Sequence, residues 1–144
     1  KSVLSNKKSI LELKKYEINK ISKDELDSIK PKLIELFNRI NIMQGESKLV
    51  GNSKVMHNLL PDLVPLIDRQ YTLRFFYGNL NSKTAPVFKK DQEAGMFIEI
   101  IDNFRQIADK LKLSLSDFDL NQSFNTSIPK IIDNAIIGLV QSKK

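Results

Sequence analysis

Apolar side chains recur along this chain mostly every three or four residues, the spacing that places them on one face of an α-helix. The clearest pattern covers residues 22–42, where Ser22 and Glu25 form an S-x-x-E capping box at the start. The apolar positions of this predicted helix are Leu26, Ile29, Leu33, Ile34, Phe37, Ile40 and Ile42. Pro31 falls inside the pattern, so we expect either a kink there or a helix that starts near Lys30.

The longest helical pattern covers residues 89–113 and has a continuous apolar stripe. The stripe consists of Ala94, Phe97, Ile98, Ile101, Phe104, Ile107, Ala108 and Leu111. A further helix is predicted over residues 128–140, with Thr126 or Ser127 as its N-cap and Pro129 in the first turn, where proline is tolerated. We expect the longest helix and the helix with the capping box to supply most of the core.

Three shorter helices complete the pattern. They are residues 10–18; residues 54–60, capped by Ser53 and ended by Pro61; and residues 69–77, capped by Asp68 and closed by Gly78. Residues 44–53 and 79–86 are predicted turns or loops, and residues 113–125 a loop with short helical turns. Because no stretch alternates like a strand, we predict an all-α fold of five to seven helices in one compact domain, residues 1–144, with residues 1–8 frayed.

Length and composition narrow the classes of protein. A chain of 144 residues is the usual size of one domain. It has no cysteine, which excludes disulfides and thiol chemistry, and its single histidine leaves little room for a metal site, so no cofactor is expected. No apolar run reaches the length of about 18 residues that a membrane span needs, and we expect a cytoplasmic protein. Since the first residue is Lys1 and not methionine, the chain is compatible with a fragment of a longer protein.

The net charge is +6, from 23 basic and 17 acidic residues. A basic balance favours an acidic partner such as nucleic acid. Lysine-rich, isoleucine-rich and asparagine-rich usage also arises from biased genome composition. The charge alone therefore leaves both interpretations open.

The strongest candidate chemistry lies in the sequence LVGNSK, which ends at Lys54. Gly51 permits a backbone turn, and the N–H groups of a helix that starts at Ser53 would favour an anion. Lys54 adds a positive charge there, so Gly51, Asn52, Ser53 and Lys54 form a candidate phosphate site. The alternative is an ordinary turn with a capping serine and a solvated lysine.

Asp68 follows an apolar run and either caps the next helix or faces a cleft. If Lys54 and Asp68 converge, a desolvated amine could attack a sugar C1′ while the carboxylate stabilises positive charge on the sugar. His57 could contact a phosphate or hydrogen-bond a backbone group. Arg69 and Arg74 lie among aromatic residues, which suits nucleic acid. The alternative is that Phe75 and one neighbour belong to the core while Arg69 pairs with a local acid.

The stretches LVGNSK and VPLIDRQYT resemble the hairpin and catalytic loop of helix-hairpin-helix DNA glycosylases. The resemblance implies a helix-hairpin-helix near residues 42–60, with Gly51 as the hairpin glycine, Lys54 as the amine and Asp68 as the catalytic aspartate. The chain also resembles uncharacterised bacterial proteins with an S-K-x-x-H and P-x-L-x-P-x-x-D pattern. Their pattern is matched here by Ser53, Lys54, His57, Pro61, Leu63, Pro65 and Asp68.

Three functions therefore remain open. The first is a nucleic-acid-binding domain, with DNA as the expected partner, that uses the phosphate-site residues together with His57, Arg69 and Arg74. The second is an active DNA glycosylase or lyase with Lys54 and Asp68 as catalytic residues. The third is a helical protein-interaction domain with no nucleic-acid role.

Overall fold

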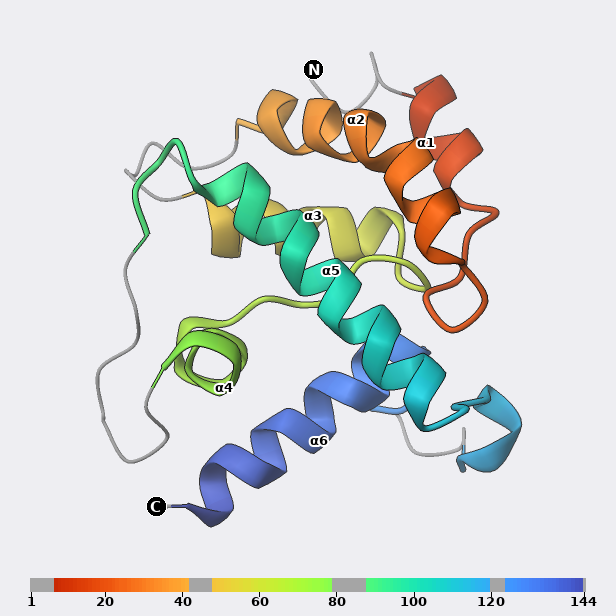
Figure 1. Cartoon of the computed structure of the whole chain (residues 1–144), viewed down its shortest axis with the longest axis vertical. Helices are drawn as coiled ribbons and strands as arrows, with labels where there is room; N and C mark the ends of the chain where they lie inside the picture. The colour runs from red at the N-terminus through yellow and green to blue at the C-terminus, as the bar shows by residue number, and fades with distance from the viewer. Residues whose placement is uncertain (1–6, 42–47, 79–87, 120–123, 144) are drawn as a thin grey trace.

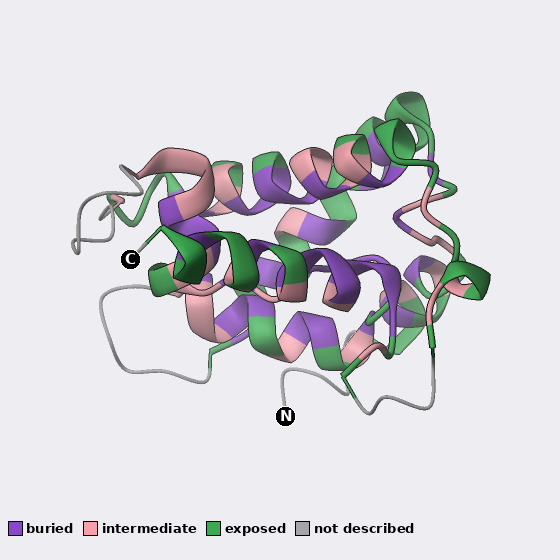
Figure 2. Ribbon diagram, turned by 90° about the horizontal axis from the view of Figure 1, so that it is seen from below, coloured by how far each residue is buried: buried purple, intermediate pink, exposed green. Residues whose placement is uncertain are grey.

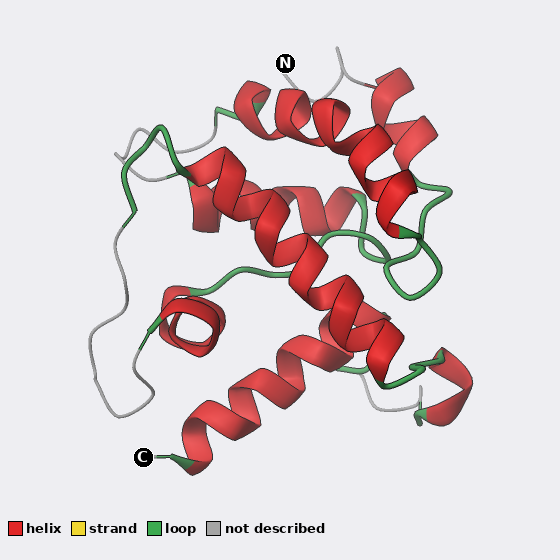
Figure 3. Cartoon of the chain, viewed as in Figure 1, coloured by secondary structure: helices red, strands yellow, loops and turns green. Residues whose placement is uncertain are grey.

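The computed structural model describes residues 7–41, 48–78, 88–119 and 124–143, and all regular structure in these ranges is helical (Figure 3). The predicted all-α fold in one compact domain is confirmed. The described α-helices are α1 (Lys7–Leu13), α2 (Lys23–Arg39), α3 (Leu49–Leu59), α4 (Arg74–Tyr77), α5 (Glu93–Lys110) and α6 (Ile128–Ser142). A π-helical turn (Arg69–Leu73) precedes α4, and a 3-10 turn (Leu115–Asp117) follows α5 (Figure 1).

Helix α2 begins at the predicted capping box. The Ser22 hydroxyl oxygen accepts from the Glu25 N–H at 3.2 Å, and the Glu25 carboxylate accepts from the Ser22 N–H at 2.9 Å. The alternative start near Lys30 is therefore wrong. Pro31 lies inside the helix and is exposed, so water can hydrate the Asp27 carbonyl that its missing N–H leaves without a helical donor.

The first helix is shorter than expected, and it starts earlier. Lys7 and Lys8, which we expected to be frayed, form its first turn, and the helix ends at Leu13. Ile18 is completely buried although it lies in the following loop. Its N–H donates to the Asp62 carbonyl at 2.8 Å, so this loop is attached to the segment that follows α3.

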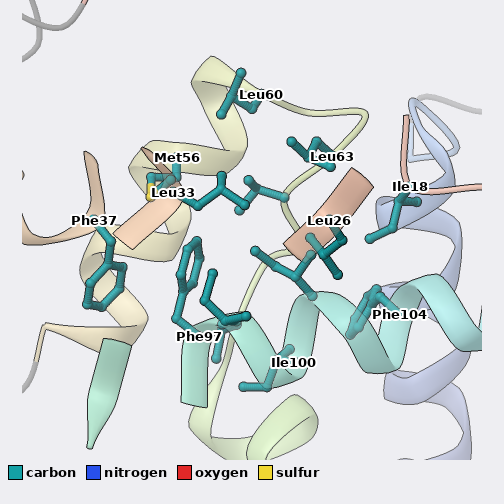
Figure 4. Packing of buried hydrophobic residues seen from close by; sticks show 14 of the residues in the cluster. Ile18, Leu26, Leu33, Phe37, Met56, Leu60, Leu63, Phe97, Ile100 and Phe104 are labelled. Atoms are coloured by element: carbon teal, nitrogen blue, oxygen red, sulfur yellow. The ribbon is translucent and has the colours of Figure 1, made fainter. Parts of the chain in front are cut away.

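The core lies between α2, α3, α5 and α6, whose buried faces point toward each other (Figure 2). Near its centre the rings of Phe37 and Phe97 stack, with centroids 4.7 Å apart (Figure 4). Among the residues that the structure describes, fewer than half of the buried apolar ones come from α2 and α5, so the expectation that these two helices supply most of the core is wrong. Segments outside helices also bury apolar side chains, among them Leu63, Val64 and Ile67.

Helix α6 begins where predicted, whereas α5 (Glu93–Lys110) is shorter at both ends than the helix predicted over residues 89–113. Ser127 caps α6, accepting from the Lys130 N–H at 3.3 Å. Helix α5 ends at Lys110, and Leu111 is 66% exposed instead of continuing the buried stripe. Gly78 ends α4 as expected. The close approach of the backbone there suits glycine, because a Cβ at this position would lie 2.8 Å from the Cα of Arg74.

Candidate nucleic-acid interface

The turn predicted over residues 44–53 is wrong for residues 49–53, because α3 already begins at Leu49. Leu49 and Met56 are buried in the core, and this packing favours helix through Gly51 despite the low helix propensity of glycine. The Lys48 N–H at the start of α3 donates to the buried carboxylate of Glu93 at 2.8 Å. The Glu93 carboxylate thus lies at the start of α3, the kind of position that we expected a phosphate to occupy. The remainder of the expected hairpin, residues 42–47, lies outside the described residues.

Asn52 and Ser53 point into the protein and have no exposed surface. The Asn52 amide donates to the Phe37 and Ile40 carbonyls at 2.8 and 3.1 Å, which attaches α3 to the end of α2. Ser53 does not act as an N-cap, because it lies inside α3 and its hydroxyl donates to the Val50 carbonyl at 2.9 Å. Both side chains therefore support the packing of α3.

His57 attaches α3 to the segment that follows it. Its Nδ1 lies 2.7 Å from the Val64 carbonyl oxygen, and the residue is 8% exposed. Since a carbonyl only accepts, Nδ1 carries the proton of this hydrogen bond. The histidine thus makes the backbone contact that was the alternative to phosphate binding, and it holds the segment from Pro61 onward against α3.

Lys54 and Asp68 have different environments. Lys54 is exposed on α3, so its amine is not desolvated in the way that a nucleophilic lysine needs. Asp68 is an N-cap, as predicted, and its Oδ1 accepts from the N–H groups of Gln70 and Tyr71 at 2.6 and 3.2 Å. No interaction described within residues 48–78 joins Lys54 to Asp68.

The helix after Asp68 begins with a π-helical turn, which the apolar pattern did not predict. Such turns are rare in proteins as a whole, but many of those that occur lie at functional sites. The Asp68 N–H donates to the hydroxyl of Thr72 at 3.2 Å, and Thr72 is completely buried. Of the two candidate arginines, Arg69 is exposed, whereas Arg74 is only 3% exposed. Of these two arginines, Arg69 is thus the one that is placed to meet a large ligand from solution.

A hollow of about 260 Å³ lies between the end of α1 and the end of α3. Its polar lining consists of Lys14, Tyr16, Asn58 and Asp62; its apolar lining consists of Leu13, Leu59, Leu60, Pro61 and Leu63. The loop after α1 and the segment after α3, which form its walls, meet at the hydrogen bond from Ile18 to Asp62 (Figure 1). Lys54 precedes Asn58 by one helical turn and shares its exposed face of α3.

Basic side chains beside this hollow are available for a partner. Within the described ranges, no ion pair engages Lys14, Lys15 or Lys54, and all three are exposed. Lys15 lies over the Tyr16 ring, with its Nζ 5.1 Å from the ring centroid. Sequence reasoning missed Lys14, Tyr16 and Asn58 because no local motif connects α1 with α3.

The nearby acids already have partners. Glu12 pairs with Lys32, whose hydrogen bond lowers the pKa of the Glu12 carboxyl and keeps it charged. Glu17 pairs with Lys20 at 2.8 Å. Both carboxylates are therefore neutralised by other lysines, which leaves Asp62 as the acid in the lining of the hollow.

A second hollow, of about 360 Å³, has an entirely apolar lining. It lies where α5, α6 and α4 approach one another, and it is lined by Phe75, Ile107, Leu111, Leu113, Phe118, Ile131, Ile132, Ala135, Ile136 and Leu139. Leu111 and Leu139 are 66% and 52% exposed. Exposed apolar patches of this kind mark interaction sites.

Neither a metal site in the described residues nor a relative of known function points to a ligand. The described residues contain no group of three or more histidine, aspartate or glutamate side chains that could hold a metal ion. Across the same part of the chain, every helix is too short or too polar to cross a membrane. Comparison with known proteins finds no significant match, whether to a family model, a curated protein or a solved structure.

Proposed function

We propose that this chain is a nucleic-acid-binding domain that contacts the phosphate backbone at the hollow between α1 and α3. The observation that carries the proposal is the meeting of Lys14, Tyr16 and Asn58 around this hollow, with Lys54 one turn away. Lysine ammonium groups and amide side chains are the usual contacts to phosphates and sugars. The net charge of +6 adds a long-range attraction to such a partner.

DNA is the nucleic acid that we propose first, because the sequence around Lys54 and Asp68 resembles helix-hairpin-helix DNA glycosylases. The contact surface differs from the one expected from that resemblance. The first turn of α3 is occupied by hydrogen bonds within the protein, whereas Lys54 and Asn58 further along the helix are exposed. Backbone contacts from Lys14 and Lys54 need no catalytic carboxylate, so the proposal is binding without a reaction.

The test is a titration of the intact chain with a fluorescein-labelled DNA oligonucleotide, followed by fluorescence anisotropy over a range of salt concentrations. Each phosphate contact contributes about one unit to the slope of log affinity against log salt. We expect Lys14→Gln and Lys54→Gln each to reduce the slope by about one unit.

The matched control is Lys143→Gln, which removes an exposed charge at the far end of α6, away from α1 (Figure 1). We expect a smaller change in affinity and an unchanged slope for this variant. If all three variants behave alike, the charge acts without a defined surface and the proposed site is wrong. If affinity is negligible even at low salt, the proposed function is wrong.

The apolar hollow on α5 and α6 favours a second candidate function, a helical protein-interaction domain. Leu111 and Leu139 expose large apolar side chains that a monomeric protein would usually cover. Absence of nucleic-acid binding would make this candidate the better one. Substitution of Leu139 by aspartate would then be expected to abolish capture of a partner while leaving the helical content unchanged.

A further inference from the structure

We propose that the hollow between α1 and α3 receives one unpaired nucleobase, so that this surface prefers single-stranded to double-stranded nucleic acid. The inference rests on the proposed function and adds the class of nucleic acid that the surface takes. It depends on the shape and lining of the hollow, because backbone contacts alone would not distinguish the two forms.

The lining of the hollow matches the two surfaces of a base. Leu59 and Pro61, which are at least partly exposed, offer an apolar wall to the flat faces of the ring. Asn58 adds an amide that both donates and accepts, as the edge of any base requires. Unstacked bases are recognised by apolar or aromatic contact together with hydrogen bonds to their edges. A base inside a duplex exposes neither face, so a paired base cannot use this lining.

The size of the hollow fits one base. Its volume of about 260 Å³ lies below the roughly 300–1,000 Å³ of sites for drug-sized ligands. A single ring system therefore fits better than a larger molecule. Lys14 in the lining and Lys54 on the adjoining turn of α3 are placed for the phosphates that flank such a base.

A neighbouring hollow of about 270 Å³ shares Tyr16 but suits a nucleotide less well. Its lining includes the carboxylates of Glu17 and Glu25 together with the side chains of Lys15 and Lys20. Hydrogen bonds from the Ser22 backbone and hydroxyl lower the pKa of the Glu25 carboxyl, which keeps it negatively charged. The described residues that line this hollow include no amide side chain for the edge of a base, so we assign the base to the hollow that contains Asn58.

The experiment compares a 12-nucleotide DNA strand with the blunt duplex of the same sequence, both labelled with fluorescein, at one salt concentration. The duplex carries twice as many phosphates and would be preferred if charge alone decided. We expect the single strand to bind about fivefold more tightly or better, since contact with one base is worth at least that factor. Asn58→Leu should abolish the preference, because it should lower the affinity for the single strand more than the affinity for the duplex.

The matched control is Asn38→Leu, which replaces another exposed amide on a helix, α2. This control should keep the preference for the single strand. Equal or tighter binding of the duplex by the unmodified chain would overturn this inference and leave the proposed function intact. A preference that survives Asn58→Leu would also overturn it. If neither the single strand nor the duplex shows salt-sensitive binding, the proposed function itself is wrong.

Discussion

Asp68 shows at the scale of a single residue how a capping role and a catalytic role compete for one carboxylate. Its Oδ1 accepts from two backbone N–H groups at the start of the π-helical turn. These are the donors that a helix start otherwise leaves unsatisfied. The cap alone is a sufficient reason for an aspartate at this position.

Substitution of Asp68 separates the two roles. Asparagine is as good an N-cap as aspartate, whereas alanine costs about 0.5–2 kcal/mol. We therefore expect Asp68→Asn to leave the free energy of unfolding nearly unchanged and Asp68→Ala to lower it by about 1 kcal/mol, as measured by urea denaturation. Asp62→Ala, an exposed loop acid with no described cap contact, serves as the control. Equal losses from Asn and Ala at residue 68 would contradict the capping role.

Helices α2 and α5 are joined at their surface by a carboxylate of α5. Asp102 accepts from Arg105 at 2.7 Å and from Lys23 of α2 at 3.2 Å. Partial burial by itself would raise the pKa of Asp102, but the hydrogen bonds from Arg105 and Lys23 outweigh it and lower the pKa below 3.8. The contribution of Asp102 to stability is thus present above pH 3.8 and lost as the pH falls through the lower value of the folded state.

This sign predicts the acid dependence of unfolding. We expect the free energy of unfolding to fall as the pH is lowered below about 4, and Asp102→Asn to remove up to about 1 kcal/mol of that fall. The control is Asp109→Asn on the same helix, whose ion pair with Lys112 is largely exposed and should contribute less. Parallel pH profiles for Asp102→Asn and the unmodified chain would contradict the bridge between α2 and α5.

The sequence predicted most elements whose signals are local. The capping box at Ser22 and the caps at Asp68 and Ser127 all start helices, because each needs only a side chain and its next few N–H groups. The start of α3 was missed, since burial of Leu49 and the hydrogen bond to Glu93 come from distant parts of the chain. The π-helical turn has no periodicity that a helical pattern could reveal.

The candidate site was predicted less well than the fold, for the same reason. Motif reasoning placed it at Gly51, Asn52 and Ser53, where residues are consecutive in the sequence. The hollow combines Tyr16 of the loop after α1 with Asn58 of α3, so it depends on tertiary contacts. Lys54 belongs to both descriptions, because it is exposed in α3 whether or not a hairpin precedes the helix.

The whole molecule has two surfaces of different chemistry. The hollow between α1 and α3 combines polar and apolar side chains and includes Lys14, whereas the hollow between α5 and α6 is apolar. Net charge could indicate an acidic partner but not the surface that binds it, because exposed lysines also occur at Lys90, Lys110 and Lys143. We therefore propose a location as well as a partner, with nucleic acid at the hollow between the ends of α1 and α3.

NMR titration of the isotope-labelled chain with a 12-nucleotide DNA strand tests this location most directly. We expect the largest changes in backbone amide shifts at Tyr16, Asn58 and Asp62, and small changes at Ile136 and Leu139 of the apolar hollow. The changes should diminish as salt is added, because phosphate contacts weaken with salt. Changes centred on α6, or none at the α1–α3 surface, would contradict the account.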